Sequence, residues 1–232
     1  MSENPARRVP KYSELGRERE IFLTPKQCRA LIAAAEPAFK PMITFALLTG
    51  MRRGAILALQ WRSVDFEHAV INIESATTKS GRKRVIPMCE RVADILQDFW
   101  TTKKVIKPDR SDRVFSSWLG QRFTGKTIER MMNEAVERCT ELPDDMREGN
   151  RNQSLTFHGL RHTAASQMVA SGMSLFEVSR ILGHSSTTTT ERYAHFAPER
   201  ATAARGALRK MGSALDAPGS IELKSGTEGK TG

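Results

Sequence analysis

Apolar residues recur at helical spacing soon after residue 20. In the segment KQCRALIAAAE, the apolar side chains of Leu31, Ile32 and Ala35 fall on one face, which predicts a helix. Thr24 is a good N-cap and Pro25 suits the first helical position. The sequence therefore predicts that the ordered part of the chain begins near this helix.

Two more helices are predicted directly after the first. Residues 41–50, PMITFALLTG, are almost all apolar, which is typical of a buried helix, and Gly50 marks its end. Residues 51–61, MRRGAILALQW, favour a short helix. These segments should supply much of the core.

The hydrophobic period changes near residue 66. Two β-branched runs, AVINIE and RVIPM, flank TTKSGRK, which is rich in turn formers and lysine. This pattern predicts a small antiparallel sheet across residues 66–87. Helical spacing returns at 89–103, and residues 113–116 favour a short extended piece.

The second half of the chain is predicted to be helical around one loop. A helix is expected at 124–139, and the polar residues 140–154 contain Pro and Gly, which indicates a loop. Further helices are expected at 158–172, 174–184, 186–196 and 198–211. Mostly helices with one small sheet predict a single α+β domain.

The domain limits follow from composition along the chain. We expect residues 1–20 to be a basic arm or linker, residues 21–212 to be the domain, and the Gly- and Ser-rich residues 213–232 to be a flexible tail. No apolar run is long enough to span a membrane, and the polar N-terminus does not resemble a secretory signal.

Charge narrows the choice of partner. The 232 residues include 36 Lys and Arg against 26 Asp and Glu, a net charge of +10 and a pI near 9.9. Such an excess indicates a polyanionic partner, although an inert basic surface is the alternative, and charge alone does not distinguish DNA, RNA and membrane. The three widely spaced cysteines form no disulfide framework or metal-binding pair, so a reducing cytoplasm is expected.

Six residues could act together on a phosphodiester. They are Arg52, Lys79, His158, Arg161, His184 and Tyr193. Arginine offers a planar fork of donors that matches two phosphate oxygens, and a tyrosine phenoxide can attack phosphorus to form a covalent intermediate. Histidine can accept the phenolic proton, and lysine can protonate a leaving alkoxide. Every role in such a reaction therefore has a residue available.

Other interpretations of the same residues exist. His158 and His162 lie four apart, as zinc ligands often do, but no third ligand stands at a suitable spacing, so no metal is expected. Residues 174–193 resemble a helix-turn-helix, which would suit a DNA-binding regulator. That interpretation leaves Arg52 and Lys79 unexplained.

Five segments in order resemble the tyrosine recombinase, or phage integrase, family. TGMRRGAILALQW resembles the segment with the first catalytic arginine, and TTKSGRKRVIPM resembles the β-hairpin segment with the catalytic lysine. LTFHGLRHTAAS matches the HxxR box, ILGHSS the next box, and ERYAH the segment with the nucleophile. The resemblance runs from about residue 23 to 196, and five boxes at these spacings are highly specific.

The resemblance implies a role for each of the six residues. Tyr193 would attack the scissile phosphate of duplex DNA and leave a 3′-phosphotyrosyl link with a free 5′-hydroxyl. Arg52 and Arg161 would hold the non-bridging oxygens with help from His184. Lys79 would protonate the leaving 5′-oxygen, and His158 would act as acid and base on the tyrosine. Four further residues are expected to bind DNA, namely Arg53, Lys83, Arg84 and His162.

The resemblance also implies partners and a setting. Family members act as tetramers on two DNA sites and exchange C-terminal segments. The helix near 198–212 is the candidate for that exchange here. Without DNA, a monomer is also compatible with the resemblance. Neither ATP nor a metal is implied. The protein would be cytoplasmic and encoded by a bacterium or phage, as part of a prophage or mobile element. Integration, excision, inversion and chromosome resolution all remain open.

Two features depart from the family pattern. The family usually has an acidic residue three positions after the first arginine, and this chain has Ala55. Family integrases usually carry a helical core-binding domain before the catalytic one, whereas about 20 residues precede the match here. A catalytic fragment, a truncated prophage product and a short natural member are all compatible with that length. A silent DNA-binding protein and a type IB topoisomerase-like enzyme are the alternative functions.

Overall fold

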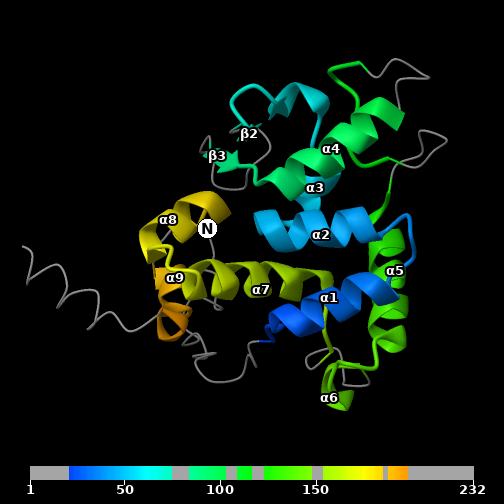
Figure 1. Ribbon diagram of the computed structural model, residues 1–232, viewed down its shortest axis with the longest axis vertical. Helices are drawn as coiled ribbons and strands as arrows, with labels where there is room; N and C mark the ends of the chain where they lie inside the picture. Colours follow the sequence, from blue (N-terminus) through cyan, green and yellow to red (C-terminus); the bar gives the residue numbers. More distant parts are fainter. Residues whose placement is uncertain are drawn as a thin grey trace, which may run out of the picture.

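The computed structural model describes residues 21–74, 84–102, 109–116, 123–147, 154–184 and 188–197 (Figure 1). Its elements are mostly helices with one small antiparallel sheet, which confirms the predicted α+β class. No helix within these ranges is long and apolar enough to cross a membrane. The basic arm, Lys79, Lys83, the helix near 198–212 and the tail lie outside the described residues.

The first three helices form where the sequence predicts them. Helix α1 (Pro25–Ala34) begins at Thr24, whose side chain accepts a hydrogen bond from the Gln27 backbone in a capping box. Helix α2 (Lys40–Thr49) ends at Gly50, which adopts the left-handed conformation with φ 61°. Helix α3 (Arg53–Ala58) follows after a short turn.

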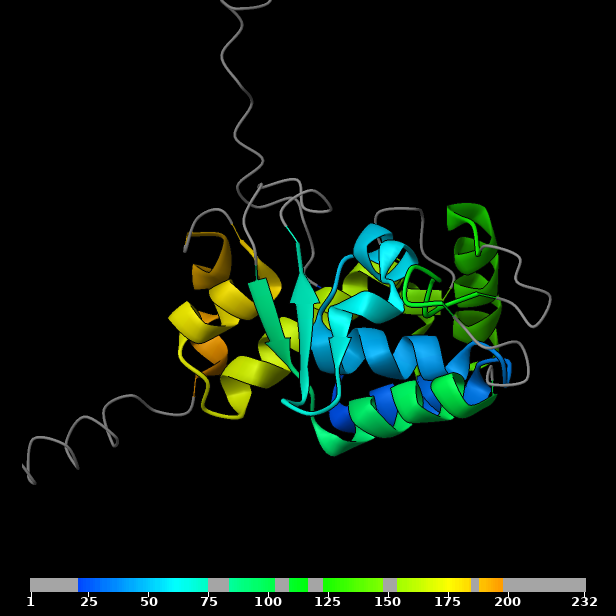
Figure 2. The same cartoon turned by 90° about the horizontal axis from the view of Figure 1, so that it is seen from above.

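A three-stranded antiparallel sheet with the strand order β1-β2-β3 occupies the middle of the chain. Strand β1 (Val64–Asp65) follows the 3-10 turn at Trp61–Ser63 and pairs with β2 (Val70–Ile73). Strand β3 (Arg84–Pro87) pairs with β2 on the other side. Strand β1 lies just before the predicted sheet. The sequence did not predict it, because two residues are too few to show an alternating pattern. Figure 2 shows β3 at the edge nearest α8.

Three helices follow the sheet. Helix α4 (Glu90–Thr102) packs Val92 and Leu96 into the core, and α5 (Gly125–Arg138) begins at its N-cap Thr124. The one-turn helix α6 (Asp144–Arg147) lies inside the segment predicted to be a loop, so that prediction was incomplete. Before α5, the predicted extended piece forms isolated bridges, among them Arg113 to Gln60, rather than a paired strand.

The last described elements carry most of the candidate chemistry. Helix α7 (Phe157–Ala170) is followed by α8 (Leu175–Leu182), which begins with a capping box at Ser174. The segment predicted as one helix at 186–196 is instead divided between α9 (Thr188–Glu191) and a 3-10 turn at Ala194–Phe196. The division falls at Tyr193, which has φ −93° and ψ 2° and therefore leaves helical geometry.

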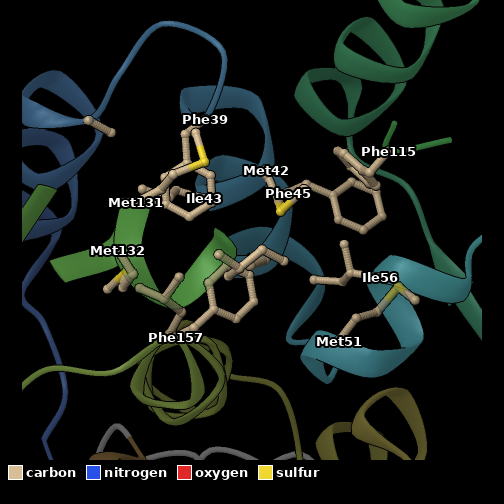
Figure 3. Packing of buried hydrophobic residues seen from close by; sticks show 14 of the residues in the cluster. Phe39, Met42, Ile43, Phe45, Met51, Ile56, Phe115, Met131, Met132 and Phe157 are labelled. Carbon is tan, nitrogen blue, oxygen red and sulfur yellow. The ribbon is translucent and has the colours of Figure 1, made fainter. Parts of the chain in front are cut away.

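The main core lies between α2 and the helices that surround it (Figure 3). Phe39, Ile43 and Phe45 are fully buried from the α2 region, and Phe157 reaches them from α7. Helices α2 and α7 pack against each other. Their packing is important for function because α7 carries Arg161 and α2 ends next to it.

Candidate active site

Arg161 is the most deeply buried charged side chain of the site, with 5% of its surface exposed. It lies on α7, and its guanidinium donates from Nη1 to the Gly50 carbonyl at 2.7 Å and from Nη2 to the Leu182 carbonyl at 2.8 Å. These carbonyls belong to the ends of α2 and α8. Because the C-terminal carbonyls of helices lack intrahelical donors and carry partial negative charge, both ends favour a cation.

Each of these helix ends has a glycine in the left-handed conformation. Gly50 has φ 61°, and Gly183, which follows Leu182, has φ 68°. The Gly183 amide donates to Ser179, and the His184 amide donates to the same carbonyl. This turn leaves the Leu182 carbonyl free to accept hydrogen bonds from side chains.

Two further arginines contribute positive charge around Arg161. Arg52 is exposed just beyond the end of α2, and Arg84 is half-buried at the start of β3, where its Nη1 donates to the Leu182 carbonyl. Burial and then the charges of Arg52 and Arg84 lower the pKa of Arg161 to about 9. Burial and the charge of Arg52 lower the pKa of Arg84 to about 10. The site is therefore strongly electropositive.

No carboxylate offsets these charges within the described residues. Arg52, Arg84 and Arg161 form no ion pair there. Ala55, at the position where the family usually has an acid, is half-buried and packs against the core. Helix carbonyls rather than an acidic side chain therefore hold Arg161.

His184 lies directly after the α8 turn and is half-buried. Its Nδ1 is 2.7 Å from Oγ1 of the buried Thr190. Burial and then the neighbouring charges, Arg161 first, lower the pKa of His184 to about 4. The imidazole is therefore neutral at pH 7 and can donate from one ring nitrogen while Thr190 fixes the other.

Tyr193 is buried, with 3% of its surface exposed, and packs among small and aliphatic side chains of α7 and α8. Its hydroxyl lies 2.5 Å from Nδ1 of His162. His158 lies one turn earlier on α7, with its ring centroid 4.9 Å from that of His162. The residues of the HxxR box and the tyrosine box, 31 positions apart, therefore meet in one cluster.

The structure places the sequence-predicted residues as follows. One electrostatic environment contains Arg52, Arg161, His184 and Tyr193. The charges of Arg52 and Tyr193 affect the pKa of Arg161, and the charges of Arg161 and Arg52 lower the pKa of His184. His162, expected to bind DNA, contacts the Tyr193 hydroxyl, the place expected for His158.

The other residues expected to bind DNA lie in different surroundings. Arg84, also expected to bind DNA, contacts α8. Arg53 is exposed on α3 near the first residue of α5, Gly125. Lys79 and Lys83 lie outside the described residues.

Sequence reasoning missed the groups that hold the site together. These are the backbone carbonyls of Gly50 and Leu182 and the hydroxyl of Thr190. Every residue type has a backbone carbonyl, so the sequence does not mark these two. The signal in the sequence is the pair of glycines, Gly50 and Gly183, at the two helix ends. Within the described part of the chain, no group of three His, Cys, Asp or Glu side chains could hold a metal ion.

Comparison with known proteins defines the class. The model of the phage integrase family matches residues 21–200, which is most of the chain and contains the whole cluster described above. The chain belongs to the phage integrase family. Its mostly helical fold with one small antiparallel sheet agrees with that membership.

Particular relatives agree with this assignment. The tyrosine recombinase XerD of Vibrio cholerae is 28% identical over 187 residues, which covers 77% of this chain and 58% of that protein. The crystal structure of XerA recombinase is 26% identical with a TM-score of 0.60, and the match covers 85% of this chain and 64% of that one. The catalytic domain of bacteriophage HP1 integrase is 25% identical with a TM-score of 0.56, over 80% of this chain and 93% of that one. The chain thus spans less than two thirds of the recombinases but nearly all of the catalytic domain.

Proposed function

We propose that this chain is the catalytic part of a site-specific DNA recombinase that cuts and rejoins duplex DNA through a 3′-phosphotyrosyl intermediate. The observation that carries the proposal is the Tyr193 hydroxyl, 2.5 Å from His162 and within the field of the buried Arg161. Relatives named as tyrosine recombinases and integrases support it, since they match this chain over most of its length.

In the first step, Tyr193 attacks the scissile phosphorus. Its proton passes to the His158–His162 pair, of which His162 is already in hydrogen-bond contact. A bond forms between the tyrosine oxygen and phosphorus, and the bond from phosphorus to the 5′-oxygen breaks. Lys79 supplies the proton for the departing 5′-oxygen.

The cations stabilise the charge that develops during this step. The phosphorane between reactant and product carries one more negative charge than the phosphodiester, so donors fixed in advance favour it. Arg161 is fixed by two carbonyls, and His184 is fixed by Thr190. Arg52 is exposed next to them and can reach a non-bridging oxygen.

The second step reverses the first with a different strand. The 5′-hydroxyl of a partner strand attacks phosphorus, and the phosphotyrosyl bond breaks to release Tyr193. The number of phosphodiester bonds is unchanged, so neither ATP nor a metal is required for the overall reaction. We propose that the chain acts as a homotetramer on paired DNA sites and that residues near 198–212 exchange between protomers.

A trapping experiment tests the proposal. A pool of duplexes with randomised sequence carries one nick placed so that cleavage releases a short oligonucleotide, which diffuses away and prevents religation. Labelled DNA that stays attached to protein on a denaturing gel identifies the covalent link, and sequencing of that DNA gives the preferred site. We expect an adduct with the wild-type chain.

The matched control is Tyr193→Phe, which keeps the buried ring and removes only the nucleophilic oxygen. This variant should bind the same duplexes and form no adduct. An equal yield from both proteins, or none from either, would remove the recombinase assignment and leave a DNA-binding protein on the same fold. Relaxation of a supercoiled plasmid lacking paired sites would point to a topoisomerase.

Two measurements test the proposed DNA interface. Arg161→Ala should abolish cleavage with only a modest loss of DNA affinity, since this buried side chain can offer few additional contacts to the ground state. DNA binding should also weaken steeply as salt concentration rises, because phosphate contacts release counterions. A flat salt response would contradict an interface that depends on the DNA backbone.

A further inference from the structure

Two arginines from distant parts of the chain share one backbone acceptor. The Leu182 carbonyl, at the end of α8, accepts from Arg161 Nη2 at 2.8 Å and from Arg84 Nη1. A carbonyl oxygen has two lone pairs, so these two guanidinium groups satisfy it fully. Because Leu182 is the last residue of its helix, no intrahelical donor competes for this position.

Arg84 also lies against the turn that follows Leu182. A Cβ added at Gly183 would stand 2.3 Å from Arg84 Nη1 and 3.2 Å from its guanidinium carbon. A side chain at position 183 would therefore displace the Arg84 guanidinium, and the φ of 68° independently favours glycine there. The contact between the turn and the guanidinium, as it stands, uses the space left by the missing side chain at residue 183.

This contact joins the sheet to α8, which lies beside β3 in Figure 2. Strand β3 lies at the edge of the sheet next to α8, and Arg84 is its first residue. The turn it covers leads directly to His184, whose backbone amide is held by Ser179. The position of Arg84 therefore affects both Arg161, through Leu182, and His184, through the turn.

We propose that Arg84 is a positioning residue: its guanidinium fixes the C-terminal turn of α8 and thereby sets Arg161 and His184 in place for the phosphodiester. This inference rests on the proposed function and deepens it. It assigns Arg84 a task different from DNA binding, and it explains the glycine at position 183.

The first test separates positioning from binding. Arg84→Gln and Arg84→Lys are compared with Arg91→Gln, which removes an exposed cation from α4. The probe is the randomised nicked duplex pool, and both the single-turnover adduct rate at saturating protein and the DNA Kd are measured. Arg84→Gln should slow adduct formation by at least about tenfold and change Kd by less than about threefold, because small misplacements of catalytic groups reduce rates more than affinity.

The other two variants complete this test. Arg84→Lys can still donate to the Leu182 carbonyl and should recover part of the rate, and Arg91→Gln should change neither quantity. A normal rate with Arg84→Gln would overturn the proposal. A large loss of DNA affinity, together with a salt dependence of binding that is reduced by the equivalent of about one phosphate contact, would also overturn it. That result is expected of a residue that binds a phosphate.

The second test uses the turn itself. Gly183→Ala should displace Arg84, so adding Arg84→Gln to it should have little further effect. The adduct rate of the double variant should stay within about threefold of the rate of Gly183→Ala alone. Effects that multiply would show that the two residues act independently and would contradict the shared contact.

The third test does not depend on catalysis. Burial, followed by Arg161 and Arg52, lowers the pKa of His184 to about 4. If Arg84 holds the turn, Arg84→Gln should admit water and raise the midpoint of the His184 NMR titration by about half a pH unit or more. An unchanged midpoint would overturn the proposal. If the wild-type chain forms no adduct, the recombinase assignment fails, and this titration still decides the role of Arg84.

Discussion

Replacing Arg161 with methionine should make the protein more stable and catalytically inactive. Arg161 is 5% exposed and lies near Arg52 and Arg84 without an ion pair among the described residues. A buried cation of this kind destabilises the folded state, whereas a long apolar side chain can occupy a similar volume. The change Arg161→Met therefore separates the requirements of stability from those of the reaction.

The magnitude follows from the pKa. Burial and the neighbouring cations lower the pKa of Arg161 from 12.5 to about 9. At 1.36 kcal/mol per pKa unit, this lowering disfavours the charged group in the folded state by about 5 kcal/mol. Because the pKa of the folded protein is the lower one, the full penalty applies below pH 9 and decreases only as the pH rises through 9.

Part of this gain is lost with the hydrogen bonds. The Leu182 carbonyl keeps Arg84, but the Gly50 carbonyl loses its side-chain donor, which costs about 1–3 kcal/mol. We therefore expect a net stabilisation of about 2 kcal/mol, within the range found for replaced buried charges. In a domain of this size, that corresponds to a rise in Tm of about 4–8 °C.

Urea unfolding at pH 7 and a thermal melt measure this effect. The control Arg91→Met removes an exposed cation and should change the free energy of unfolding by less than about 0.5 kcal/mol. Sulfate should stabilise the wild-type protein more than Arg161→Met, since an anion can neutralise the intact cluster. A variant less stable than wild type by about 1 kcal/mol or more would refute the reasoning, because it would show that the guanidinium is already compensated.

Three further predictions follow from single features of the site and its supports. The His184 pKa of about 4 implies that stability falls as pH drops from 6.5 towards 4, where the unfolded chain binds the proton first, and that His184→Gln reduces this loss in acid denaturation curves. Gly50→Ala should cost about 2 kcal/mol in urea unfolding, because φ is 61° and the new Cβ would lie 2.3 Å from Leu182 Cδ2; an unchanged midpoint would contradict this close approach. Ser174→Ala removes the α8 capping box and should cost about 1 kcal/mol with unaltered DNA cleavage.

Local signals account for the parts of the fold that the sequence predicted well. The start of α1 follows from Thr24 and Pro25, and the end of α2 follows from Gly50, because caps depend on a few neighbouring residues. The missed elements β1 and α6 have two and four residues, too few to show a period. The break at Tyr193 was missed for a different reason, since it depends on packing against α7 and α8.

For the candidate site too, local sequence signals were predictive and contacts between distant segments were not. Motif spacing identified the residue types at Arg161, His184 and Tyr193, and the structure brings these side chains into one environment. The contact of Tyr193 with His162 could not be predicted, because it joins residues 31 positions apart through the packing of α7 against the segment after α8. The contact of Arg84 with Leu182 joins residues 98 positions apart and involves a carbonyl that every residue type possesses.

The missing carboxylate at Ala55 has a consequence for catalysis. An acid at this position would offset one positive charge and orient the neighbouring arginines, whereas here the Gly50 and Leu182 carbonyls orient Arg161 without carrying a full negative charge. Among the described residues, no carboxylate therefore offsets the positive charge of the cluster before an anion binds. A phosphodiester carries one negative charge and a phosphorane two, so the uncompensated cluster favours the transition state over the bound substrate, which is the condition for faster reaction. The two carbonyls already orient Arg161, so a carboxylate would add only negative charge. Ala55→Glu should therefore raise stability and slow adduct formation.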